Sequence, residues 1–132
     1  MKNIDKTLDD LHSKLIRLKN TNENGNGQCY TCGAKLTYHT AECGHYPYIG
    51  RGNMMFRWNT EIHKIQCNNC NCFSDGEPER FRDNLINEIG AKRLSKIEFE
   101  SRKPYKWFKS DKKQLIKEFR NEIKELLKEK TI

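Results

Sequence analysis

Cys29-Tyr-Thr-Cys32 and Cys67-Asn-Asn-Cys70 decide how this chain folds. In each stretch two thiolates lie in one tight turn and can face the same ion, and two such turns complete the four-sulfur tetrahedron that Zn²⁺ prefers. Gly33 follows the first pair, where the backbone of a cysteine knuckle turns back. We therefore predict one structural Zn²⁺ ion bound by all four cysteines.

Composition favours a metal over disulfides. The chain has 132 residues, 35% hydrophobic and 33% charged, so its core is thin and needs a staple. We expect no secretory signal and no membrane segment, because no run of about 18 apolar residues occurs. The expected location is the cytoplasm, that of a bacterial host if a phage encodes the chain, where thiols stay reduced. Disulfides and a redox CxxC are the alternatives, and a redox CxxC needs no second pair. Cys43 and Cys72 fall outside the pairs and are expected to be small side chains beside the site.

The charge indicates a polyanionic partner. Lys and Arg number 25 against 18 Asp and Glu, which gives a net charge of +7. Nucleic acid is the commonest partner of such a surface. The alternative is a basic surface that serves only solubility.

Helices are expected on both sides of the cysteine-rich core. Residues 1–20 form an amphipathic helix with one apolar seam at alternating spacings of four and three. The seam residues are Ile4, Leu8, Leu11, Leu15 and Leu18. Residues 21–28, rich in Asn and Gly, are predicted to be a flexible linker.

Residues 29–90 form the predicted zinc-stapled core, and residues 91–132 a C-terminal helical extension. Within the core, Pro78 suits the first turn of a helix that Gly90 ends. In the extension, Ser110 is the predicted cap of a long amphipathic helix. That helix carries Phe119, Ile123 and Leu126 on one face. Its apolar face and the N-terminal seam can pair within one chain or between two copies in a homodimer.

The segment 33–66 between the two pairs is longer than the gap of a zinc ribbon, so further structure is inserted there. It carries Gly44-His45-Tyr46, Arg51-Gly52 and Arg57-Trp58. Gln66-Cys-Asn-Asn-Cys-Asn71 and Phe81-Arg-x-x-Leu-x-x-x-Ile-Gly90 follow. This order resembles the NinG (Rap) family of phage recombination endonucleases, of the HNH or ββα-metal class. The resemblance implies an α+β fold, with a small zinc-stapled ββα-metal core and flanking N- and C-terminal helices.

Chemistry at these positions agrees with that resemblance. Hydrolysis of a phosphodiester needs a base for water and a divalent ion to stabilise charge on the phosphate. His45, an imidazole at the end of a predicted strand, is the candidate base. The resemblance implies that Asn71 binds the catalytic Mg²⁺ or Mn²⁺. Glu42 is the first candidate for a second ligand and His63 the next.

Two positions depart from the class. Gly44 stands where an Asp or His usually precedes the base, and Ile62 stands where the middle asparagine usually lies. Asn59 is the candidate to orient His45 in place of that asparagine. The alternative for Asn59 is an ordinary turn residue.

Several basic and aromatic side chains are candidate DNA contacts, with solubility as the alternative. They are Arg51, Arg57, Lys64, Lys103, Lys106 and Trp107. His12 and His39 are expected to be surface histidines without a role.

The function expected from the resemblance is metal-dependent cleavage of branched recombination intermediates, such as D-loops and Holliday junctions. One alternative is a zinc-knuckle DNA-binding module without catalysis. The other is a general HNH nicking endonuclease. No property of the sequence other than the resemblance reports the shape of the DNA.

Overall fold

A helix, four short strands and a run of helices follow one another in the computed structural model, which describes residues 3–132. The elements in chain order are α1 (Ile4–Lys19), β1 (Asn26–Gln28), β2 (Lys35–Thr37), β3 (Glu42–Gly44), β4 (Lys64–Gln66), the π-helix η1 (Asn69–Phe73), α2 (Pro78–Ile89), α3 (Ala91–Glu100) and α4 (Lys109–Lys128). The predicted α+β class is confirmed. None of these helices is long and apolar enough to cross a membrane.

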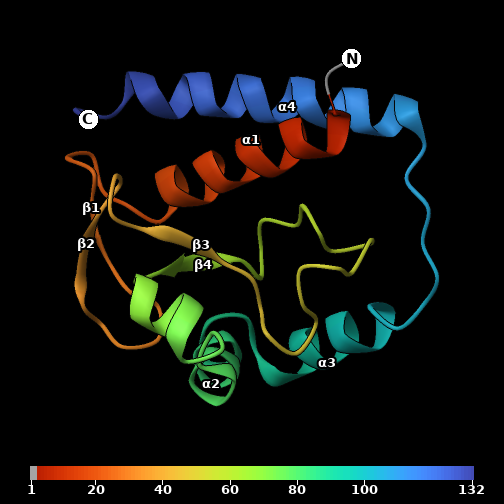
Figure 1. Ribbon diagram of the computed structural model, residues 1–132, viewed down its shortest axis with the longest axis horizontal. Helices are drawn as coiled ribbons and strands as arrows, with labels where there is room; N and C mark the ends of the chain where they lie inside the picture. The colour runs from red at the N-terminus through yellow and green to blue at the C-terminus, as the bar shows by residue number, and fades with distance from the viewer. Residues whose placement is uncertain (1–2) are drawn as a thin grey trace.

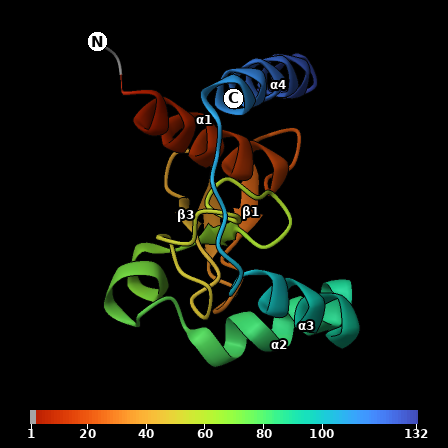
Figure 2. The same cartoon turned by 90° about the vertical axis from the view of Figure 1, so that its right-hand side faces the viewer.

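The elements form three layers. Helices α1 and α4 lie side by side along the top of Figure 1, and the strands lie beneath them. Helices α2 and α3 form the bottom layer, and the turned view in Figure 2 shows the same order. The strands are therefore covered by helices on both sides.

Each pair of strands is an antiparallel hairpin. β1 pairs with β2, with Gly27 opposite Leu36. β3 pairs with β4, with Cys43 opposite Ile65. Between β3 and β4, residues 45–63 run as turns and bends. The chain thus runs from strand β3 through this loop to the return strand β4 and then into the short helix η1, which begins inside the second cysteine pair.

α1 begins where Asn3 caps it, because the Asn3 side chain accepts the backbone N–H groups of Asp5 and Lys6. Its apolar seam packs against α4 in the same chain. The buried members of this cluster are Leu8, Leu15, Leu18, Trp58, Phe119 and Ile123. The seam thus has an intrachain partner, which was the alternative to a homodimer. A homodimer stays a prediction, but the apolar seam of α1 no longer supports it, because that seam is covered by α4.

The predicted flexible linker is wrong, because part of it belongs to the fold. The side chain of Asn22 accepts the backbone N–H groups of Asn24 and Asn26, which closes a turn leading into β1. The C-terminus fixes the same turn, since the Lys130 ammonium donates to the carbonyls of Thr21 and Asn22. Asparagine side chains and the distant C-terminus replace the apolar anchor that the sequence lacks.

The remaining helix ends differ in how well the sequence predicted them. α2 begins at Pro78 and ends at Gly90, whose φ of 90° suits glycine. α4 begins before the predicted cap Ser110, because the Asp111 carboxylate accepts the Phe108 backbone N–H. Ser110 therefore lies inside the first turn of α4.

The packing of α1 on α4 predicts that Phe119→Ala lowers the free energy of unfolding by about 3 kcal/mol, because Phe119 is 4% exposed and its loss leaves a cavity. Phe99→Ala is the matched control, since Phe99 is also helical but 58% exposed. It is expected to cost less than about 1 kcal/mol. Urea denaturation of both variants checks this, and equal losses would contradict the burial of Phe119.

Candidate functional site

The four predicted zinc cysteines lie together. One ligand atom from each of Cys29, Cys32, Cys67 and Cys70 lies within 4.8 Å of the others. The Cys32 and Cys67 sulfurs are 3.7 Å apart. Four sulfurs at the usual zinc bond length are about 3.8 Å apart along each edge of the tetrahedron. The cysteines are free thiols in this structure, and the cluster can hold a structural metal such as zinc.

Backbone contacts fix this cluster against the second hairpin. The Tyr30 N–H, inside the first knuckle, donates to the Ile65 carbonyl of β4 at 2.9 Å. Cys67 follows β4 directly, and its sulfur accepts the Cys70 backbone N–H. Gly33 has a φ of 78° and turns the first knuckle back. Both knuckles are thus attached to β4, and η1 begins inside the second.

Glu42 and Asn71 come together beside the middle of η1. Glu42 lies at the start of β3, and Asn71 directly follows the last clustered cysteine. The Asn71 amide donates to the Glu42 carboxylate at 2.9 Å. That bond holds the pKa of Glu42 below its ordinary value, against the opposing effect of burial. A carboxylate and a side-chain amide therefore lie side by side, and both groups carry oxygens of the type that hard divalent ions prefer.

Glu42, Asn71 and His45 line one cleft of about 730 Å³. His45 enters it directly after β3 ends. Burial, followed by the charges of His12 and Arg51, lowers the pKa of His45 to about 4. His45 is therefore neutral at neutral pH, with a lone pair that can accept a proton.

Two further histidines lie against His45. The ring centroids of His45 and His63 are 4.3 Å apart, and those of His12 and His63 are 4.8 Å apart. His12 and His63 are each only 1% exposed. The expectation that His12 is a surface histidine without a role is wrong. His39, the other histidine of that expectation, is exposed.

Asn59 acts on a different pair of rings from the one expected. Its backbone carbonyl lies 2.7 Å from His12 Nε2 and 2.6 Å from His63 Nδ1. Its side chain accepts the backbone N–H groups of Glu61 and Ile62, which is the turn-residue alternative. The carbonyl contacts orient His12 and His63, and these two rings in turn pack against His45.

His63 was expected as a second ligand beside Asn71. The His63 ring packs against the other two histidines, whereas the Asn71 amide contacts Glu42. The three histidines and the Glu42–Asn71 pair are thus two groups, and His45 faces both.

Packing explains why a glycine, Gly44, stands where an Asp or His usually precedes the base. A Cβ at Gly44 would meet the side chain of Gln66, with Cδ only 2.7 Å away. Gln66 is fully buried, and its amide donates to the Thr31 hydroxyl and the Gly76 carbonyl. Gln66 thus ties the first knuckle to the turn after η1 and occupies the space that an acid at position 44 would need.

The basic side chains predicted to contact DNA around the cleft differ in whether they already have an acidic partner. Arg51 is exposed and lines the cleft, and it has no ion pair among residues 3–132. Arg57 donates to the Asp9 carboxylate at 3.0 and 2.7 Å. Lys64 pairs with Glu88 at 2.6 Å. Arg57 and Lys64 therefore have acidic partners, and Arg51 is available to a phosphate.

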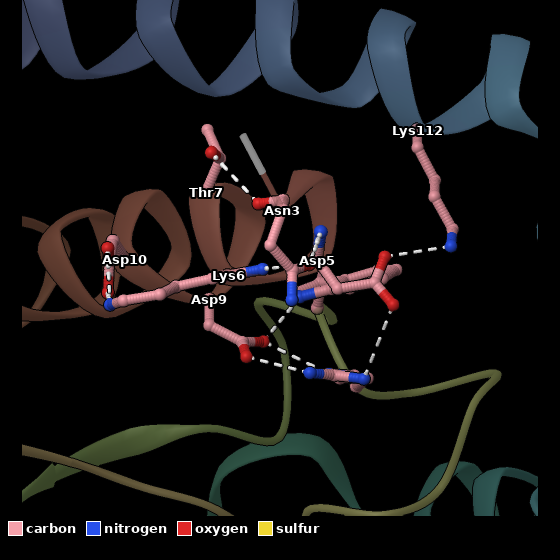
Figure 3. A network of polar contacts seen from close by, with 9 residues as sticks. Asn3, Asp5, Lys6, Thr7, Asp9, Asp10 and Lys112 are labelled. Atoms are coloured by element: carbon pink, nitrogen blue, oxygen red, sulfur yellow. Dashed lines mark hydrogen bonds and ion pairs between the residues drawn. The ribbon is translucent and has the colours of Figure 1, made fainter. Parts of the chain in front are cut away.

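The acids of α1 organise the loop 45–63. Figure 3 shows Asp5 and Asp9 pointing from α1 toward this loop, with Lys112 reaching Asp5 from α4. The Lys112 ammonium is 2.8 Å from the Asp5 carboxylate. The Trp58 indole N–H also donates to Asp9, at 2.8 Å. Ion pairs and this hydrogen bond fix the loop to α1, and the Lys112–Asp5 pair ties α1 to α4.

The three candidates in the α3–α4 connection each contact another residue of the protein. The Trp107 indole N–H donates to the Met54 carbonyl at 2.7 Å, which anchors the connection to the loop 45–63. Lys103 pairs with Glu100 at 3.2 Å. Lys106 lies over the Phe108 ring, 5.9 Å from its centroid.

These features define a small α+β protein in which a four-cysteine cluster braces a hairpin beside a histidine-rich cleft. The chain belongs to the family described as the bacteriophage lambda NinG protein, whose family model matches residues 1–129. The predicted family is thus confirmed, and membership suggests a role related to phage recombination. Searches of curated proteins and of solved structures found no significant match.

The packing at Gly44 predicts that Gly44→Ala lowers the free energy of unfolding by about 1–3 kcal/mol, because the added Cβ collides with a side chain that two hydrogen bonds hold in place. Gly52→Ala is the matched control, since nothing lies within 4 Å of a Cβ there. In the double variant Gly44→Ala/Gln66→Ala the losses should be less than additive, by about 0.5 kcal/mol or more. Additive losses in denaturant unfolding would exclude the collision.

The burial of His45 predicts that its ring titrates with a midpoint near pH 4, far below the ordinary value of 6.5. The ring then keeps its lone pair throughout the range above that midpoint. NMR titration of the four histidines measures this, with the exposed His39 as reference in the same molecule. A midpoint for His45 at or above 6.5 would mean that the ring is not desolvated.

Proposed function

We propose that this protein is a metal-dependent, structure-specific DNA endonuclease of the HNH class. Its substrates are branched recombination intermediates such as D-loops and Holliday junctions. The observation that carries the proposal is the convergence of Glu42, Asn71 and His45 on one cleft. A pair of oxygen ligands beside a neutral imidazole is the set of groups that phosphodiester hydrolysis needs.

Each group has one task in this proposal. Glu42 and Asn71 hold Mg²⁺ or Mn²⁺ through their oxygens, since these ions prefer carboxylate and amide ligands. When bound, the ion supplies charge stabilisation on the phosphate and the leaving oxygen. His45 accepts the proton of the attacking water. Arg51 neutralises a phosphate at the cleft edge.

The cysteine cluster has a structural task in the proposal. Zn²⁺ bound by it would hold η1, which carries Asn71, against the hairpin that carries Glu42 and presents His45. Catalytic groups must be fixed to fractions of an ångström, and a metal staple provides that in a thin-cored chain. Folding would then depend on zinc.

The preference for branched DNA rests on family membership, which suggests a recombination-related role. The net charge of +7 supports binding to DNA in general but not to any particular shape. A general nicking endonuclease and a non-catalytic DNA-binding module are therefore separate outcomes of one cleavage test.

We predict that the protein cuts D-loops and four-way junctions in Mg²⁺ or Mn²⁺ and that His45→Ala lowers the cleavage rate by about 100- to 10,000-fold, because a base acts on the chemical step. The measurement is single-turnover cleavage of labelled linear duplex, flap, D-loop and four-way junction. His39→Ala is the matched control and should cut at the wild-type rate. Elemental analysis of each variant confirms equal zinc content.

The outcomes separate the three functions. Equal cutting of all four substrates would indicate a general nicking endonuclease. Tight binding without cleavage would indicate the non-catalytic module. Wild-type cleavage by a folded His45→Ala variant would show that the base is another group.

The different partners of Arg51 and Arg57 predict different effects on DNA binding. Arg51→Ala should weaken binding and reduce the slope of log affinity against log salt by about one, since one phosphate contact is lost. Arg57→Ala should leave the slope unchanged and lower stability instead, because it leaves Asp9 without its guanidinium. Fluorescence anisotropy at several salt concentrations measures both. A reduced slope in the Arg57 variant would make it a phosphate contact.

A further inference from the structure

The proposed endonuclease uses one imidazole, yet the structure gathers three. His12 comes from the middle of α1, His45 follows β3 and His63 precedes β4. Figures 1 and 2 show α1 lying over the strands β3 and β4, which brings His12 to the second hairpin. Three segments far apart in the sequence therefore contribute one histidine each.

We propose that His12, His45 and His63 form a second metal site, which takes a divalent transition ion such as Zn²⁺, Co²⁺ or Ni²⁺. One ring nitrogen from each residue lies within 4.8 Å of the others. Three imidazoles on one tetrahedral ion have nitrogens about 3.3 Å apart. Binding of one ion by all three rings would therefore draw the most distant nitrogens about 1.5 Å closer together.

The Asn59 carbonyl holds two of the three rings as a metal site requires. It accepts an N–H from His12 Nε2 at 2.7 Å and from His63 Nδ1 at 2.6 Å. A histidine that binds a metal ordinarily donates its other N–H to a carbonyl or carboxylate, which fixes the ring and its tautomer. With both N–H groups engaged there, each ring keeps its second nitrogen as a lone-pair donor.

The protonation of the rings also suits a metal. Burial lowers the pKa of His12 and of His63, so both are neutral at neutral pH. Imidazoles bind metals only in the neutral form. The Asp9 carboxylate lines the same cleft as His12 and His45, with the Arg57 guanidinium as its partner.

The ligand type separates this site from the two others. Imidazole nitrogen prefers Zn²⁺, Co²⁺ and Ni²⁺, whereas the Glu42–Asn71 oxygens prefer Mg²⁺ or Mn²⁺. The cysteine cluster offers only sulfur. His12 and His45 line the cleft, so the fourth ligand position can be reached by water.

The site goes beyond the proposed endonuclease activity and can be tested without DNA. An ion on the three rings occupies the lone pair with which His45 would accept a proton. Metal ligand and base are therefore alternative states of the same ring.

The test starts from untagged full-length protein with one zinc equivalent in the cysteine cluster. Titration with Co²⁺ or Ni²⁺ by calorimetry should show one further equivalent. The Co²⁺ spectrum should lack a thiolate-to-cobalt charge-transfer band, because the ligands are imidazoles. No second equivalent, or a spectrum dominated by thiolate ligation, would overturn the proposal.

His12→Gln should weaken binding of the second equivalent by about 10-fold or more. His39→Gln is the matched control and should bind as the wild type does. An unchanged affinity in a folded His12→Gln variant would overturn the proposal.

NMR of wild-type protein decides the matter even if His12→Gln does not fold. A second equivalent of Zn²⁺, which is diamagnetic, should shift the ring nitrogens of His12, His45 and His63 and leave those of His39 in place. Shifts at His39 alone, or at none of the four histidines, would overturn the site.

Discussion

Helix α1 contacts the rest of the protein through two adjoining faces, and the arrangement of the cleft depends on these contacts. One face is the apolar seam against α4. The other is a polar stripe at positions 5, 9 and 12, spaced by four and three residues, which contacts the loop 45–63 through Arg57, Trp58 and Asn59. Since this loop carries no strand or helix of its own, contacts with α1 supply much of its order. A helix that reads as an appendage in the sequence is therefore part of the site.

The sequence predicted best those features that a local chemical pattern encodes. Two CxxC pairs specify a four-sulfur cluster whatever the surrounding fold, because each turn brings its own thiols together. Pro78 and Gly90 mark the ends of α2 for equally local reasons. Glu42 and Asn71 were paired through a family pattern, and the structure places them in direct contact.

The missed features depend on long-range contacts between polar groups. A hydrophobic pattern reports the seam of α1 and is silent on Asp9 and His12, because both side chains are polar and their partners lie in a distant loop. The signal that existed was their spacing of three, one stripe beside the seam, together with Ile16 one turn beyond His12. The linker was missed similarly, since Asn22 and Lys130 order it through hydrogen bonds.

The surroundings of His45 depend on both the local sequence patterns and the long-range polar contacts. The hairpin and the cysteine cluster place it beside the Glu42–Asn71 pair, α1 adds the imidazole of His12, and the segment before β4 adds that of His63. The Gln66 side chain fills the space beside position 44, so packing excludes an acidic side chain there. Burial and the nearby His12 and Arg51 lower the pKa of His45, so the ring stays neutral and keeps its lone pair. A neutral ring with a free lone pair can bind a metal ion or accept a proton transiently, whereas a permanent positive charge on it is disfavoured. Helix α1 contributes to this environment by placing His12 against His45.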